Sequence, residues 1–207
     1  MRVFVATPAH GPLEPEVAHA YARLLSWLDR HVAAATWRIE ARNPNQALAR
    51  NCLAHLFLES GYDVMICGDR DSVFEPEDVA NLFRAGRDVV GACCKMRTLD
   101  SNWVGSEMLP RVQDGALIEM ARIGFGLVAL TRHAVSTMAA NAPSIVPQTG
   151  ACAGKFIAEV FRPEVDPETR NPIGVDYAFS DRWRALGGHL WLHTGVQIGH
   201  VGPHVFR

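Results

Sequence analysis

The 207-residue sequence lacks the features that mark several classes of protein. It has no run of basic residues interleaved with aromatics, and its formal net charge is -2, so we expect no nucleic-acid partner. No stretch approaches about 18 consecutive apolar residues, and the first residues show no basic region or cleavage site. We therefore expect no membrane span and no signal peptide, and we predict a cytoplasmic protein.

Cysteine is scarce and is not arranged as a framework. The five cysteines are odd in number, no C-x-x-C pair occurs, and Cys93 and Cys94 are adjacent. These spacings favour neither a thiolate zinc site nor a set of disulfides. Since most of the cysteines lie within apolar runs, we expect buried free thiols in a reducing compartment.

What is present is a regular alternation of strand and helix patterns, which predicts an α/β fold in a single domain. The apolar runs predict strands at Val3–Ala6, Thr36–Glu40, Asp63–Cys67, Val89–Cys93, Leu127–Leu130 and Leu190–Leu192. Helical periodicity and end signals predict helices at Pro15–Ala34, from an Asn45 cap to Ser60, from Pro76 to Gly86, at Arg132–Ala140 and at Asp176–Leu186.

Two segments are less regular. Residues 97–121 contain an Asp-Gly turn at Asp114 and Gly115, which predicts a hairpin laid against the sheet. Residues 141–172 are rich in proline and contain one strand-like segment, Lys155–Phe161. A connection of this length favours a substrate loop or lid.

Two carboxylates follow the middle strand. Asp69 and Asp71 are separated by one residue, so an extended chain would project both to the same side, where oxygen ligands suit Mg²⁺ or Mn²⁺. Carboxyl ends of parallel strands are also where open α/β sheets bind ligands. The competing interpretation is a structural one, in which Asp71 or Ser72 only organises the turn into the next helix.

The order of motifs resembles that of GT-A glycosyltransferases, especially those of family 2, over most of the chain. The matching segments are Ala49-Arg50-Asn51, Val64 to Cys67, Asp69-Arg70-Asp71, Phe74-Glu75-Pro76-Glu77-Asp78, Gly124-Phe125-Gly126-Leu127-Val128, Val175-Asp176-Tyr177-Ala178-Phe179 and Gly199-His200-Val201-Gly202. The resemblance implies a mostly parallel, Rossmann-like sheet flanked by helices, with a small antiparallel hairpin or second sheet. Residues 1–96 would form the nucleotide-binding half and residues 97–207 the acceptor side.

The implied activity is metal-dependent transfer of a sugar from a UDP- or GDP-sugar to a hydroxyl acceptor. By resemblance Asp71 would bind the metal directly, Asp69 would reach the metal or the ribose, and His200 would complete the protein's ligands. An imidazole suits manganese better than magnesium, so Mn²⁺ is the preferred ion and Mg²⁺ the alternative. For His200 the competing interpretation is a surface residue of a glycine-flanked loop.

The resemblance also implies a set of nucleotide-sugar contacts. They are Thr7, Pro8, Ala9, His10, Glu40, Arg50, Asp69, Arg70, Gly124, Phe125 and Gly126. Arg50 would either pair with the diphosphate or hold a loop, and Glu40 would face the nucleobase or be an exposed charge at a strand end. Lys95, Arg97 and Trp103 are weaker candidates, for phosphate or acceptor contacts in the first two and for sugar stacking in the third.

Asp176 is the candidate general base, because inverting transfer requires removal of a proton from the acceptor hydroxyl. A helix cap next to Gly174 is the competing interpretation. Val175 stands where the family has a glutamate, which leaves inversion or retention open.

Two other functions fit a similar sheet. A sugar nucleotidyltransferase would need a basic loop after the first strand, and Thr7 to Pro12 contains no Lys or Arg. A non-catalytic module that binds a glycan or a protein is also consistent with the chain's modest length. The sequence leaves open a homo-oligomer in which a neighbouring subunit completes the site.

Overall fold

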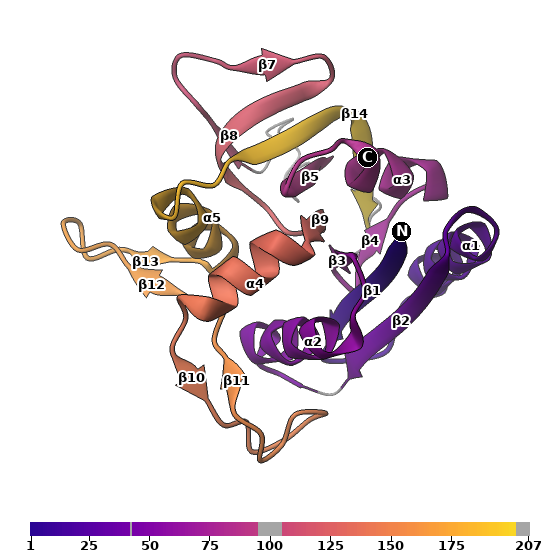
Figure 1. The fold of residues 1–207 in the computed structure, drawn as a ribbon, viewed down its shortest axis with the longest axis horizontal. Helices are drawn as coiled ribbons and strands as arrows, with labels where there is room; N and C mark the ends of the chain where they lie inside the picture. Colours follow the sequence, from indigo (N-terminus) through magenta and orange to yellow (C-terminus); the bar gives the residue numbers. More distant parts are fainter. Residues whose placement is uncertain (42, 95–104, 202–207) are drawn as a thin grey trace.

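The computed structural model describes residues 1–41, 43–94 and 105–201, which form an α/β fold around one large sheet (Figure 1). The main strand order is β2-β1-β3-β9-β5-β14-β8-β6. Five strands run parallel to one another: β1 (Arg2–Ala9), β2 (Ala34–Ala41), β3 (Val64–Gly68), β5 (Val89–Cys94) and β14 (Leu190–His200). The predicted fold class, a mostly parallel sheet with helices and small antiparallel additions, is confirmed.

Helices cover both faces of the sheet, which explains why its central strands are continuously apolar. One face packs against α1 (Pro15–His31) and α3 (Pro76–Arg84). The other packs against α2 (Gln46–Ser60), α4 (Arg132–Ala140) and α5 (Val175–Ala185). In β1, Phe4 packs in the core on the side of α2, α4 and α5, whereas its neighbours Val3 and Val5 pack in the core on the side of α1 and α3.

The end signals read from the sequence act as expected in α2. The Asn45 side chain accepts a hydrogen bond from the Leu48 amide at the start of the helix, and Gly61 ends it in the left-handed conformation with φ 72°. The Asn45 oxygen satisfies a backbone amide that the helix leaves unpaired, and glycine adopts the left-handed conformation at the helix end without steric cost. This cap fixes where the first two turns of α2 point, and those turns carry Gln46 and Arg50.

Three elements differ from the sequence prediction. The strand β9 (Leu127–Thr131) runs antiparallel between β3 and β5, a direction that its apolar pattern does not encode. The last strand is longer than predicted, because β14 shifts register against β5 between His193 and Gln197 and then continues to His200. Beyond this irregularity it pairs with the short β4 (Ser72–Val73).

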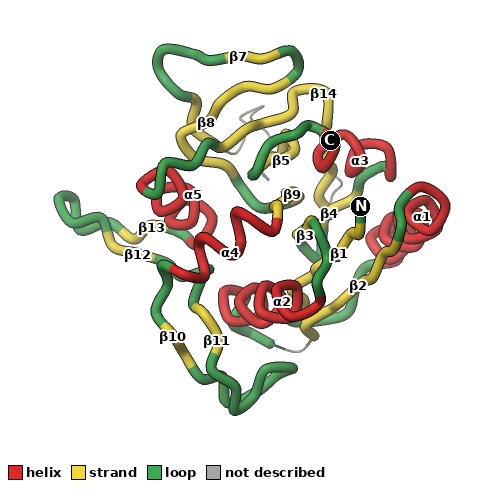
Figure 2. The backbone as a smooth tube through the Cα atoms, in the orientation of Figure 1, coloured by secondary structure: helices red, strands yellow, loops and turns green. Residues whose placement is uncertain are grey.

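The proline-rich segment forms two small arms rather than one strand. In the first arm β10 (Ser144–Ile145) pairs with β11 (Ile157–Ala158), and in the second β12 (Glu164–Val165) pairs with β13 (Pro172–Ile173). The predicted strand Lys155–Phe161 is therefore reduced to the two residues of β11, whose partner β10 lies between Pro143 and Pro147. Both arms extend from the helical layer that contains α4 (Figure 2).

The predicted hairpin exists around Asp114 and Gly115, where β7 (Gln113–Asp114) pairs with β8 (Leu117–Ile123). The strand β6 (Gly105–Glu107) pairs with the same edge of β8 as β7, and the opposite edge of β8 pairs with β14. Lys95, Arg97, Trp103 and Gly202 lie outside the described residues.

All five cysteines are free and buried, as predicted. Among the helices that the structure describes, none combines the length and the apolar character needed to cross a bilayer.

Candidate functional site

A buried arginine joins two of the predicted site residues. Arg50 donates from Nη2 to Asp69 Oδ1 at 2.8 Å and from Nη1 to Asp176 Oδ1. The Arg50 side chain is 3% exposed, whereas those of Asp69 and Asp176 are 22% and 31% exposed. The carboxylates therefore face solvent while the cation between them does not. This cluster lies where β3 ends and α5 begins.

The helix α2 positions Arg50 together with a residue that the sequence analysis missed. Gln46, one turn earlier, donates from Nε2 to the same Asp69 Oδ1 at 2.9 Å. The Arg50 guanidinium also lies over the Phe125 ring, 5.6 Å from its centroid. Burial lowers the pKa of Arg50, but Asp69 and Asp176 raise it by more, so the guanidinium stays charged. The four-residue spacing from Arg50 was the signal for Gln46.

The segment Gly124–Gly126 contributes its backbone to the site. The Phe125 amide donates to Asp176 Oδ2 at 3.0 Å, and the Gly126 carbonyl accepts from the Asp69 amide at 3.0 Å. The Phe125 ring itself is buried and meets the stacked rings of Phe161 and Phe179 edge to face. Phe125 therefore packs in the core rather than presenting its ring to a sugar, and the segment ties the start of α5 to the end of β3.

Asp69 and Asp71 do not lie in an extended segment, as the sequence argument assumed. The Ser72 amide donates to the Asp69 carbonyl at 3.2 Å, which closes a turn over Asp69–Ser72. The Ser72 hydroxyl fixes this turn by donating to the Gly126 carbonyl at 2.7 Å. The two carboxylates are consequently held by a turn, and strand alternation does not set their directions.

His200 is also placed differently from the prediction. It is the last residue of β14, 9% exposed, and it pairs with Ser72 of β4 rather than standing in a loop. The next residue, Val201, donates its amide to the Asp71 carbonyl at 2.8 Å. The register shift in β14 thus brings the backbone of His200 beside the turn that contains Asp71, although the two residues are far apart in sequence.

The surroundings of the His200 ring are close-packed. Cys94 Sγ lies 3.3 Å from Nε2 and 3.5 Å from Nδ1, and such nearly equal distances put the sulfur over the ring face rather than in line with either nitrogen. A Cβ on Gly126 would lie 3.3 Å from His200 Nε2 and 2.9 Å from Ile198 Cδ1. Glycine at position 126 therefore gives the imidazole its space.

The donor types fit a divalent ion, since Asp71 supplies carboxylate oxygen and His200 supplies imidazole nitrogen. Gly126 leaves room beside the imidazole, and Asp69 Oδ1 is already shared by Arg50 and Gln46. Within residues 1–41, 43–94 and 105–201, no group of three or more His, Cys, Asp or Glu side chains is gathered closely enough to hold a metal. The metal assignment accordingly remains a prediction.

The first loop is only partly exposed. Thr7, Pro8 and Ala9 belong to β1 and are buried, and the Thr7 hydroxyl accepts a hydrogen bond from Trp37 Nε1 at 3.0 Å. His10 is exposed. Arg70 donates from Nη1 to the Pro12 carbonyl at 3.2 Å, so it links the turn after β3 to this loop.

Glu40 is buried, with 4% exposure, which excludes the exposed strand-end charge considered above. Its carboxylate accepts from the Ala151 amide at 3.3 and 3.4 Å. Gly150, with φ 85°, allows this contact, because a Cβ there would lie 2.2 Å from Glu40 Oε1. Glu40 therefore anchors the arm formed by β10 and β11.

An open pocket of about 420 Å³ borders the cluster on the side of α5. It is lined by Gln46, Arg50, Gly174, Val175, Asp176 and Tyr177. Asp176 lies in the first turn of α5. The N-cap residue of this helix is Gly174, which has no side chain that could accept a hydrogen bond from the helix amides. The Asp176 carboxylate at the wall of this open pocket is accessible to a substrate hydroxyl. A carboxylate that only capped the helix would not have to face a pocket.

Comparison with known proteins identifies the fold but no family. No family model matches the sequence, and no curated protein sequence matches it. The solved structure of A197 from STIV is 18% identical, with a TM-score of 0.60, over 98% of this chain and 86% of that chain. The crystal structure of GalNAc-T7 with UDP, GalNAc and Mn²⁺ is 13% identical, with a TM-score of 0.54, over 97% of this chain but 44% of that chain.

These similarities establish a GT-A-like, Rossmann-like α/β fold. At such low identities they say nothing about which reaction this chain performs. The chain spans less than half the length of GalNAc-T7, so parts of that protein have no counterpart here.

Proposed function

We propose that this chain is a glycosyltransferase that moves a sugar from a UDP- or GDP-sugar to a hydroxyl group of an acceptor. The observation that carries the proposal is the Asp69–Arg50–Asp176 cluster, which joins the end of a central parallel strand to a pocket. Ligands of open α/β sheets bind at this edge.

Asp176 is the proposed general base. In the proposed reaction the acceptor oxygen forms a bond to the anomeric carbon, its proton passes to the Asp176 carboxylate, and the bond to the diphosphate oxygen breaks. Arg50 and the Phe125 amide hold that carboxylate from two sides. Arg50 is thus a positioning residue in this proposal rather than a group that touches the reacting atoms.

Asp71 and His200 are the proposed protein ligands of Mn²⁺ or Mg²⁺, with Asp69 binding the ion or the ribose of the donor. A divalent ion would supply positive charge against the diphosphate as it leaves. Arg50 and Gln46 occupy Asp69 Oδ1, and no described residue hydrogen-bonds Oδ2, which supports a donor-facing role for that oxygen. Arg70 and His10 border the same side of the sheet.

Donor binding is tested by thermal unfolding with a panel of UDP- and GDP-sugars, each with and without Mn²⁺. A ligand that binds only the native state raises the melting temperature. We expect one nucleotide class to raise it in the presence of the metal and the Asp71→Asn variant to abolish the shift. Asp29→Asn, an exposed carboxylate on α1, is the matched control. Absence of a shift with every nucleotide sugar would overturn the proposal.

The role of Asp176 is tested by separating binding from turnover. We expect Asp176→Asn to keep the donor-induced shift, since an amide oxygen still accepts from Arg50, and to lose about 100-fold or more of the transfer or hydrolysis rate. Asp29→Asn should retain the full rate. Equal rates for wild type and Asp176→Asn would remove Asp176 from the mechanism.

A further inference from the structure

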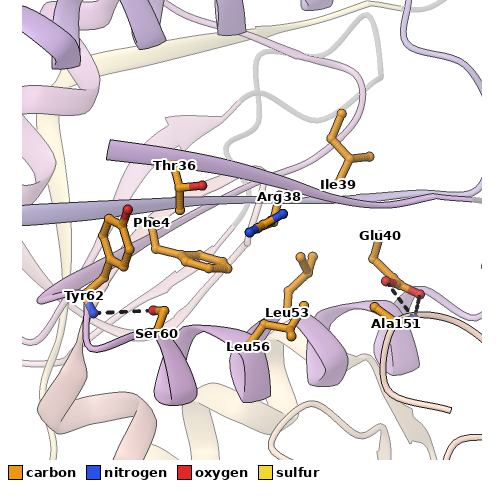
Figure 3. A pocket seen from close by; sticks show the side chains of 10 residues that line it. All are labelled: Phe4, Thr36, Arg38, Ile39, Glu40, Leu53, Leu56, Ser60, Tyr62 and Ala151. Atoms are coloured by element: carbon orange, nitrogen blue, oxygen red, sulfur yellow. Dashed lines mark hydrogen bonds between the residues drawn. The ribbon is translucent and has the colours of Figure 1, made fainter. Parts of the chain in front are cut away.

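A second pocket, of about 410 Å³, lies between α2 and the edge strand β2 (Figure 3). Its α2 wall is formed by Leu53, Leu56 and Ser60, which follow Gln46 and Arg50 along the helix. The pocket therefore runs away from the Asp69–Arg50–Asp176 cluster. Its volume falls within the range of small-molecule sites, which is roughly 300–1,000 Å³.

Most of the wall is apolar. Phe4 and Leu53 are buried at its base, and the Phe4 ring meets the Tyr62 ring edge to face, with centroids 6.0 Å apart. Leu56 adds a further aliphatic surface. Phe4 and Leu53 have almost no exposed surface, so an apolar group of a ligand would gain by covering the half-buried Leu56 and Tyr62.

One strong cation faces this wall. Trp37 stacks on Tyr21 toward α1, so strand alternation turns its neighbour Arg38 toward α2. In Figure 3 the Arg38 side chain lies near Phe4 and Leu53, on the α2 side of the strand. No hydrogen bond or ion pair joins Arg38 to any residue that the structure describes. A guanidinium in this setting favours an anion that accepts two hydrogen bonds.

The acidic residue in the pocket does not neutralise Arg38. Both oxygens of Glu40 accept from the Ala151 amide, at 3.3 and 3.4 Å, so its carboxylate is held against the β10–β11 arm. The carboxylate oxygens of Glu40 thus lie at one end of the pocket. A ligand with a second negative charge near that end would be repelled.

We propose that this pocket binds a small organic monoanion, with one carboxylate on Arg38 and a compact apolar body against Leu56 and Tyr62. The inference is independent of glycosyl transfer, because it uses none of the residues of the Asp69–Arg50–Asp176 cluster. It depends on the charge of Arg38 and on the open volume between α2 and β2.

The probe is 3-phenylpropionate, and its neutral analogue 3-phenylpropanamide has nearly the same shape. We expect the acid to bind saturably, with NMR shift changes at the amides of β2 and of the second half of α2. The amide should bind about tenfold more weakly, because it lacks the charge-assisted contact. Equal affinity for acid and amide would overturn the proposal, as would no saturable binding of the acid below about 1 mM.

Two variants separate charge from volume. Arg38→Gln should lose about tenfold in affinity for the acid and nothing for the amide. Arg111→Gln is the matched control, since the side chains of Arg38 and Arg111 are both exposed and neither has a partner among the described residues. Leu56→Trp should fill the pocket and weaken both ligands while the fold, checked by circular dichroism, is kept. Binding of the acid that survives both Arg38→Gln and Leu56→Trp would place the ligand elsewhere and refute the assignment.

Discussion

Arg50 is a fully desolvated cation whose two partner carboxylates remain partly in water. Removing one member of a buried ion pair is costly because the remaining charges lose their partner, whereas exposed pairs contribute little. From the sequence, Arg50 is expected either to pair with a diphosphate or to hold a loop. Its contacts now favour the holding role in this structure.

We expect Arg50→Met to lower the free energy of unfolding by about 2–4 kcal/mol, since the partial exposure of Asp69 and Asp176 moderates the loss. Arg23→Met is the control, because Arg23 pairs with Glu75 at the surface and should cost less than about 1 kcal/mol. Urea denaturation measures both. Similar losses for the two variants would show that the buried cluster is not a stabilising unit.

Gly126 packs closely against Ile198 and the His200 ring, and a side chain at this position would contact both. We expect Gly126→Ala to cost about 1–3 kcal/mol, because its methyl group would press on Ile198 and on the His200 ring. The same variant should weaken any Mn²⁺-dependent donor shift, since it displaces the imidazole. Gly154→Ala is the comparison: a methyl there meets no neighbour within 4 Å, so its cost reflects backbone conformation alone. An unchanged Mn²⁺-dependent shift in Gly126→Ala would argue against His200 as a ligand.

At the scale of elements, the contact between β2 and the β10–β11 arm links stability to pH. Burial raises the pKa of the Glu40 carboxyl above its ordinary value of 4.5, and the hydrogen bond from Ala151 offsets only part of this. The native state therefore holds the proton more tightly than the unfolded chain. Stability contributed by this group is complete below pH 4.5 and is lost as pH rises through the folded-state pKa.

Glu40→Gln removes that ionisation and keeps an oxygen for the Ala151 amide. We expect the variant to gain stability relative to wild type as pH rises from about 4 to 8, as followed by thermal unfolding across this range. Glu168→Gln, which changes an exposed carboxylate in the turn between β12 and β13, is measured in parallel as the surface comparison. A constant difference between wild type and Glu40→Gln at every pH would contradict the assignment.

Elements were predictable where local chemistry defines them. The Asn45 cap, the left-handed Gly61 and the apolar runs of β1, β3 and β5 carry their own signals in sequence. The direction of β9, the extension of β14 to His200 and the turn at Asp69–Ser72 depend on partners distant in the chain. In the site, the motifs point to Asp69, Asp71 and Asp176, and the four-residue spacing from Arg50 is a local signal for Gln46. The Glu40–Ala151 contact has no such signal, because it depends on tertiary packing.

Across the whole molecule, local stability should follow the depth of the sheet. Amides of β1, β3 and β9 lie in strands that are paired on both sides and covered by helices, whereas the two arms are short and paired on one side. We expect hydrogen–deuterium exchange to be slowest in the former and fastest in β10–β13. Protection of the arms equal to that of the central strands would mean that they belong to the cooperative core.

The insertion of β9 between β3 and β5 has a consequence for biosynthesis. A nascent chain that has emerged only to residue 120 contains β3 and β5 but not the strand that bridges them, and β14 arrives later still. One edge of β3 and both edges of β5 then stay uncovered during translation, a state that is prone to pair with other chains. Fragments that end before β9 should be captured by chaperones or should aggregate, whereas chains that extend through β14 can cover both edges of β5.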